Sequence, residues 1–186
     1  MNAVRILGLC GSLRRGSYNR RLLDVAAREL PESAVFEVFD RLGGIPPYSE
    51  DIPAPAAVTA LREAIRDADG MLIATPEYNA SLPGQLKNAL DWASRPFPDN
   101  ALRDKPVVVV GASTGLFGAV WAQAELRKVL TTIGAQVVDA ELPVGQAHGA
   151  FTSDGRLGDD RLRSELAGLI DRLACLSDHR VVEQCG

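Results

Sequence analysis

The sequence predicts an α/β protein in which helices cover both faces of a single parallel sheet. Short apolar runs rich in valine, isoleucine and leucine alternate with longer segments whose apolar residues recur at helical spacing. Residues 71–73 and 107–110 are apolar at every position, as expected of strands that helices cover on both sides. The composition shows no break along the chain, so we expect one domain over residues 1–186.

Predicted strands and helices alternate along the chain. Strands are expected at residues 4–9, 35–39, 70–75, 107–112 and 136–138. Helices are expected at residues 19–30, 55–68, 83–94, 118–133 and 159–176. Joined by right-handed crossovers, five such strands favour a flavodoxin-like three-layer sandwich with strand order 2-1-3-4-5. This order places a ligand crevice at the carboxyl ends of the first and third strands.

Charge and composition limit the partners that this protein can have. The formal net charge is −4, which opposes binding to nucleic acid or to an anionic membrane surface. Aromatic residues make up only 5% of the chain, too few for an extended base-stacking surface. The sequence contains no apolar run of membrane-spanning length and does not begin with a secretory signal pattern, so we expect a cytoplasmic location.

The cysteines indicate neither a disulfide framework nor a metal site. Cys10, Cys175 and Cys185 are odd in number and widely spaced, and the chain has only two histidines. Cys10, at the end of the first predicted strand, is expected to be a small buried apolar residue without a reactive role.

The turn after the first strand is the first candidate binding element. Residues 11–20 read Gly-Ser-Leu-Arg-Arg-Gly-Ser-Tyr-Asn-Arg and lead into the first helix, whose unpaired N–H groups and dipole favour an anion. We expect a phosphate here, with hydrogen bonds from Ser12, Ser17 and Asn19 and charge from Arg14 or Arg15. The alternative is an ordinary capped turn in which Ser17 or Asn19 is the N-cap.

Three better-known phosphate motifs do not fit this turn. A nucleotide triphosphate loop requires lysine where Ser17 lies, so triphosphate hydrolysis is not expected. The spacing of Gly8, Gly11 and Gly16 does not match the dinucleotide-binding fingerprint. A thiolate phosphatase with Cys10 as nucleophile would require arginine at position 16.

Two further loops are expected at the same edge of the sheet. Residues 75–84 read Thr-Pro-Glu-Tyr-Asn-Ala-Ser-Leu-Pro-Gly. The prolines and Ser81 can be explained by the strand exit and the next helix, but Glu77, Tyr78 and Asn79 cannot, and polar groups there suit a flat heteroaromatic ring. In the loop 111–118, glycines allow close backbone approach and N–H groups can stabilise negative charge on such a ring.

Residues 9–14, 16–19 and 75–92 together resemble the NADPH-dependent FMN reductase family, in the branch that includes bacterial quinone, chromate and azo-dye reductases. The resemblance covers nearly the whole chain and implies FMN as cofactor. It implies two sets of cofactor-binding residues, Ser12, Arg14, Ser17, Tyr18 and Asn19 at the phosphate turn, and Pro76, Glu77, Tyr78, Asn79, Ser113, Thr114 and Gly115 around the isoalloxazine ring.

The resemblance also implies the reaction. NADPH or NADH passes a hydride to flavin N5, leaves, and is replaced by a small oxidant such as a quinone, free flavin, chromate or an azo compound. No side chain is expected to act as a catalytic acid, base or metal ligand. Two alternatives are a flavodoxin-like carrier of single electrons to a protein partner, and a subunit that has lost its flavin.

A homodimer or homotetramer is expected, first because of the resemblance. The second reason is Trp121, which stands on the fourth helix where the family often has arginine, and which suits a buried anchor at an interface. The alternative is that Trp92 and Trp121 both pack in the core of the monomer. Arg127 either matches the family's Leu-Arg pair or is an ordinary exposed helix residue.

Overall fold

The computed structural model describes residues 3–177. The strands are β1 (Val4–Cys10), β2 (Ala34–Phe39), β3 (Gly70–Thr75), β4 (Pro106–Ala112), β5 (Gln136–Val137) and β6 (Pro143–Val144). The helices are α1 (Tyr18–Glu29), a short 3-10 helix η1 (Leu42–Gly44), α2 (Ala56–Asp67), α3 (Gly84–Ala93), α4 (Val120–Ile133) and α5 (Asp160–Ser177). Every predicted strand and helix is present, with each end within about two residues of its expected position.

The sheet has the predicted order β2-β1-β3-β4-β5, and all its strand pairs are parallel. The prediction missed β6, which pairs with β4 in parallel and places Pro143 beside Gly111 and Val144 beside Ala112. Two residues, one of them proline, carry no periodic signal from which a strand could be predicted. β6 extends the pairing of β4 toward its carboxyl end, beyond the point where β5 stops.

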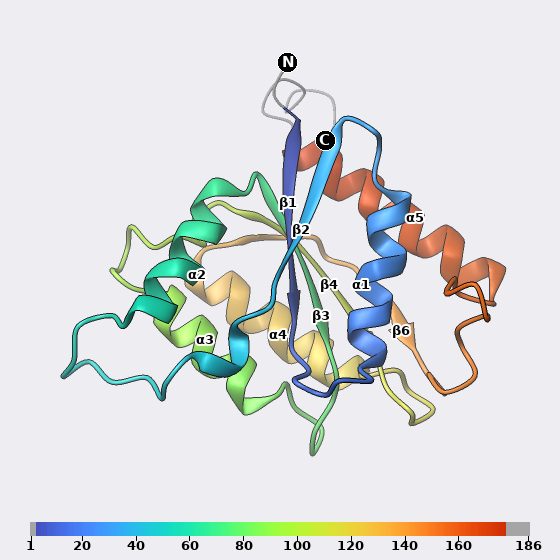
Figure 1. The fold of residues 1–186 in the computed structure, drawn as a ribbon, viewed down its shortest axis with the longest axis horizontal. Helices are drawn as coiled ribbons and strands as arrows, with labels where there is room; N and C mark the ends of the chain where they lie inside the picture. Colours follow the sequence, from blue (N-terminus) through green and yellow to red (C-terminus); the bar gives the residue numbers. More distant parts are fainter. Residues whose placement is uncertain (1–2, 178–186) are drawn as a thin grey trace.

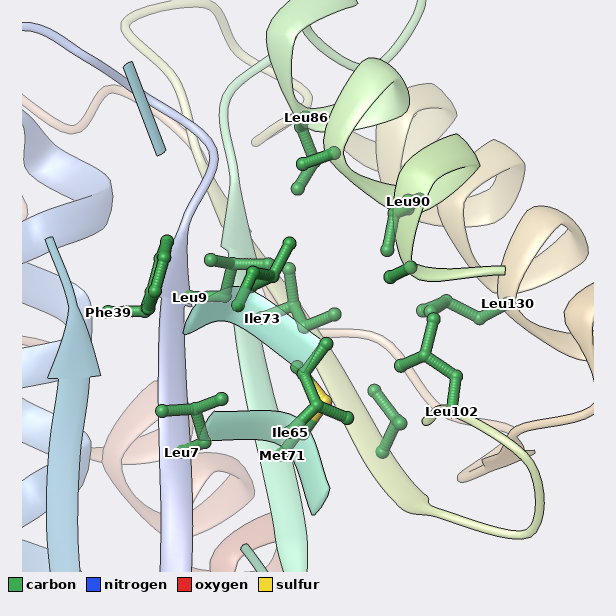
Figure 2. Close-up of a cluster of buried hydrophobic side chains, with 14 of the residues drawn as sticks. Leu7, Leu9, Phe39, Ile65, Met71, Ile73, Leu86, Leu90, Leu102 and Leu130 are labelled. Atoms are coloured by element: carbon green, nitrogen blue, oxygen red, sulfur yellow. The ribbon is translucent and has the colours of Figure 1, made fainter. Parts of the chain in front are cut away.

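Helices form a layer on each face of the sheet, with α1 and α5 on one side and α2, α3 and α4 on the other (Figure 1). Alternate residues of each strand enter the two cores, because side chains alternate between the faces of a strand. Figure 2 shows one core, in which Leu7 and Leu9 of β1 and Met71 and Ile73 of β3 face the helices on the α2–α4 side. Ile6, which precedes Leu7, and Leu72, which lies between Met71 and Ile73, pack in the other core against α1 and α5.

The loops that follow β1, β3 and β4 lie at one edge of the sheet, at the bottom of Figure 1. This edge is where parallel strands all end, so segments far apart in the sequence come together there. Among residues 3–177, no helix combines the length and the apolar character needed to cross a membrane.

The cysteines differ from expectation. Cys175, on α5, is disulfide-bonded, contrary to the sequence prediction, and Cys185 lies outside the described residues. Cys10 is free, as predicted, but only half-buried, and its thiol lies 3.4 Å from the carbonyl oxygen of Ser12.

Candidate functional site

The turn after β1, in which a phosphate was expected, leads into the start of α1, where several backbone N–H groups are unpaired among the described residues. Ser17 is the N-cap of α1, and its hydroxyl accepts a hydrogen bond of 3.2 Å from the N–H of Arg20. The N–H groups of Gly16, Ser17, Tyr18 and Asn19 have no acceptor among the described residues. Such donors bind an anion readily, because the helix dipole adds partial positive charge at the same point.

Asn19 is at the site, but its carboxamide is already used. Its Nδ2 donates to the carbonyl of Ala112 and its Oδ1 accepts from the N–H of Ala112, both at 2.9 Å. The side chain is buried and fixes the start of α1 against the end of β4. This contact joins the phosphate turn to the third loop, which was not part of the role predicted for Asn19.

Arg14 and Ser12 lie on the open side of the turn. The Arg14 guanidinium is exposed and has no hydrogen bond or ion pair with the described residues, so it is free to contact an anion. The N–H of Arg14 donates to the Ser12 hydroxyl at 3.4 Å. Tyr18 is half-buried and stacks on Phe151, with ring centroids 6.2 Å apart.

The loop after β3 forms a tight turn over residues 78–81. Tyr78 and Ser81 exchange two backbone hydrogen bonds of 3.0 and 3.1 Å. Between them Asn79 and Ala80 have φ angles of 53° and 60°, in the left-handed region. The turn leaves the Tyr78 side chain 47% exposed.

Glu77 makes a contact that the sequence did not reveal. Its carboxylate oxygen Oε2 accepts hydrogen bonds of 3.1 Å from the N–H groups of both Trp121 and Ala122, at the start of α4. The Glu77 side chain therefore caps α4. Its predicted role was a direct one at the ring.

The loop after β4 has unpaired backbone N–H groups. The N–H of Ser113 donates to the carbonyl of Val144 at 3.1 Å, whereas the N–H groups of Thr114 and Gly115 have no acceptor among the described residues. The loop is pressed against the segment after β6, because a Cβ atom built on Gly145 would lie 2.1 Å from the carbonyl oxygen of Leu116. Only glycine permits such a backbone contact.

The three loops surround one hollow of about 90 Å³. All but two of the predicted cofactor residues line it; the exceptions are Asn79 and Gly115. Ala112 also lines it, but it was not predicted because its side chain has no polar group. The lining residues are Ser12, Arg14, Ser17, Tyr18, Asn19, Pro76, Glu77, Tyr78, Ala112, Ser113 and Thr114. A hollow of about 460 Å³ beside Tyr48 and Trp92 is larger, so size alone does not identify the site. A pocket that encloses a drug-sized ligand has about 300–1,000 Å³, so this hollow is too small to enclose a ligand of that size.

The tryptophans have different environments. Trp92 is 3% exposed, and its indole N–H donates to the Pro46 carbonyl at 2.9 Å, so it belongs to the core. Trp121 is 50% exposed and lies edge-to-face with Phe117, with centroids 5.2 Å apart. Arg127 is not an ordinary exposed residue, because it binds the Ala140 carbonyl at 3.3 Å and Glu141 at 3.2 Å.

Comparison with known proteins agrees with this geometry. Residues 4–149 match the family described as NADPH-dependent FMN reductase. An NAD(P)H-dependent FMN reductase of Pseudomonas aeruginosa is 45% identical over 164 residues, which cover 86% of this chain and 88% of the relative. A 2-hydroxy-1,4-benzoquinone reductase of a Burkholderia species is 37% identical over 183 residues, which cover 96% of this chain and 100% of the relative. The solved structure of FerB, a flavoenzyme NAD(P)H:(acceptor) oxidoreductase from Paracoccus denitrificans, superimposes with a TM-score of 0.84 at 34% identity and covers 95% of this chain and 98% of its own.

Proposed function

Since this chain belongs to the NADPH-dependent FMN reductase family, we propose that the hollow at the ends of β1, β3 and β4 holds its FMN and that quinones are its electron acceptors. The chain is an NAD(P)H-dependent oxidoreductase with FMN as cofactor.

The convergence of three loops on one hollow is the observation that carries the proposal. The first loop offers unpaired N–H groups and the Arg14 guanidinium, which together suit one phosphate dianion. The second and third loops offer Pro76, Tyr78 and the backbone around Thr114, which suit a flat ring. One phosphate site next to one ring site matches FMN better than FAD, which carries a second phosphate.

When bound, FMN supplies hydride transfer between the nicotinamide donor and the acceptor. The chain's own contribution is to bind and orient. The start of α1 and Arg14 neutralise the phosphate charge, and Asn19 keeps this turn in register with the third loop. The free N–H groups of Thr114 and Gly115 can hold negative charge at the ring edge, without a side chain acting as acid or base.

The small size of the hollow bears on which acceptors are suitable. A ring bound there would be incompletely enclosed, and a ring face left exposed would accept a planar nicotinamide or oxidant by stacking. A quinone has the required flat shape and accepts two electrons, and the Burkholderia relative is described as a benzoquinone reductase. We therefore place quinones ahead of free flavin, chromate and azo compounds.

Initial-rate kinetics test this function. Donor and acceptor would compete for the same open face, so double-reciprocal plots of rate against NADPH at several 1,4-benzoquinone concentrations should give parallel lines. Intersecting lines would require both molecules to be bound together and would contradict the single open face. If the two electrons from each NADPH instead end on two separate protein molecules, one on each flavin, the result would support the electron-carrier alternative.

We also propose a homodimer or homotetramer in which a second subunit covers the apolar side chains that are exposed at the start of α4. These side chains lie within six positions of one another and are Leu116, Phe117 and Trp121, with exposed fractions of 70%, 59% and 50%. Exposed aromatic and aliphatic side chains grouped in this way are typical of an interface between subunits. The cytoplasmic location stays a prediction from the sequence.

A further inference from the structure

Helix α4 has no N-cap of its own. Its N-cap position is Ala119, which has a left-handed backbone with φ of 63° and no side-chain acceptor. Serine, threonine, aspartate or asparagine normally fills this position, because the first N–H groups of a helix lack partners. Here Oε2 of Glu77, 44 residues earlier in the chain, accepts from Trp121 and from Ala122 at 3.1 Å each.

The loop after β3, which begins with Pro76 and Glu77, is also attached to α4 further along, at Ser81. The hydroxyl of Ser81 donates to Oε2 of Glu125 at 2.5 Å, one helical turn beyond the residues that Glu77 caps. Residues 77–81 are thus held on α4 at both ends. We call the two contacts together the α4 clamp.

The turn between these two contacts has a backbone conformation that requires stabilisation by its surroundings. Asn79 and Ala80 both adopt left-handed backbone angles, which asparagine tolerates but which cost free energy in alanine. Such conformations persist where the surrounding structure fixes them. The α4 clamp and the paired backbone of Tyr78 and Ser81 are the contacts that do so.

We propose that Glu77, although it lines the hollow, acts as a positioning residue for the flavin ring through the α4 clamp, because its Oε2 is engaged by the N–H groups of Trp121 and Ala122. By fastening the loop to α4, it holds Pro76 and Tyr78 at the hollow before any ligand arrives. The inference rests on the proposed function, because it assumes that the ring lies against this loop. If only a fraction of the molecules has the loop in place, the apparent affinity for the ring is the intrinsic affinity multiplied by that fraction.

The first experiment measures the affinities for riboflavin and FMN by fluorescence titration of Glu77→Ala, Glu77→Gln and the unsubstituted protein. Both ligands carry the ring, but only FMN carries the phosphate. Losing a cap of this kind should weaken both by a similar factor, about fivefold. Glu77→Gln keeps a carbonyl acceptor for Trp121 and Ala122 and should return both affinities close to the original values.

Asp159→Ala is the matched control. Asp159 caps α5 in the same way, accepting from Arg161 at 2.8 Å and from Leu162 at 3.2 Å, but it does not line the hollow. Its removal should lower the melting temperature about as much as Glu77→Ala does and leave both flavin affinities unchanged. Unchanged riboflavin affinity in Glu77→Ala, or an equal loss in Asp159→Ala, would overturn the positioning role.

Hydrogen exchange of the flavin-free protein separates this inference from the proposed function. Glu77→Ala should speed exchange at the Trp121 and Ala122 amides and across residues 77–81, whereas Asp159→Ala should not. Unchanged exchange in residues 77–81 would show that Glu77 does not hold the loop. Faster exchange in a protein that binds neither flavin would establish the clamp and refute the proposed function.

Discussion

Single residues at the site divide into those free to contact a ligand and those already used by the fold. Arg14 is free, whereas Asn19 and Glu77 are bound to backbone groups 93 and 44 residues away. The sequence predicted that these residues lie at one edge, because that depends only on strand order. It did not predict which would be used internally, because the partners are backbone N–H and C=O groups whose position depends on the packing of other elements.

Arg14 tests the phosphate assignment at the level of one side chain. A hydrogen bond to a charged group contributes about 1.5–3 kcal/mol, so Arg14→Ala should weaken FMN binding about tenfold or more. Riboflavin, without a phosphate, should bind as before. Arg15→Ala is the control, because Arg15 is a neighbouring exposed arginine that does not line the hollow. Equal FMN affinities for the two variants and the unsubstituted protein would mean that the phosphate lies elsewhere.

At the scale of the element, the helices and long strands could be predicted, and the short pieces could not. The apolar period defined α5 and the all-apolar runs defined β3 and β4, since these signals are local. β6 lies against the loop after β4, where two glycines allow close backbone approach: a Cβ on Gly118 would lie 2.4 Å from the Pro143 carbonyl carbon, and one on Gly145 would lie 2.1 Å from the Leu116 carbonyl oxygen. The tight turn at 78–81 was also missed, because Asn-Ala is a weak form of the Asn-Gly signal.

This turn gives a stability prediction. Ala80 has φ of 60° and is exposed, so Ala80→Gly should relieve left-handed strain and create the Asn-Gly pair favoured in such turns. The free energy of unfolding in urea should rise by up to about 1 kcal/mol. Ala124→Gly, at an exposed position inside α4, should lower it by about the same amount. A decrease for Ala80→Gly would mean that the alanine is not strained there.

At the scale of the whole molecule, the strand order explains why the candidate site could be located from the amino-acid sequence. Parallel strands β1, β3 and β4 are neighbours, so the loops that follow them must meet at one edge. The position of the hollow follows from topology, whereas its depth and its free donors depend on side-chain packing. The surface that a second subunit would cover depends on which helix faces remain exposed, and the two helical tryptophans differ in burial, with Trp92 3% and Trp121 50% exposed.

A substitution at Trp121 tests whether turnover depends on the assembly of subunits. If a second subunit covers the apolar side chains exposed at the start of α4, Trp121→Glu should place a charge in the interface, shift the protein to monomers in analytical ultracentrifugation and lower turnover with quinone. The monomer should stay folded, because half of the Trp121 surface is already in solvent and its backbone N–H still meets Glu77. Phe97→Glu, at an aromatic residue 69% exposed on the loop after α3, is the control and should leave assembly and turnover unchanged. An unsubstituted protein that sediments as a monomer at assay concentration, with full quinone reductase activity, would show that the exposed aromatic surface on α4 serves no subunit contact.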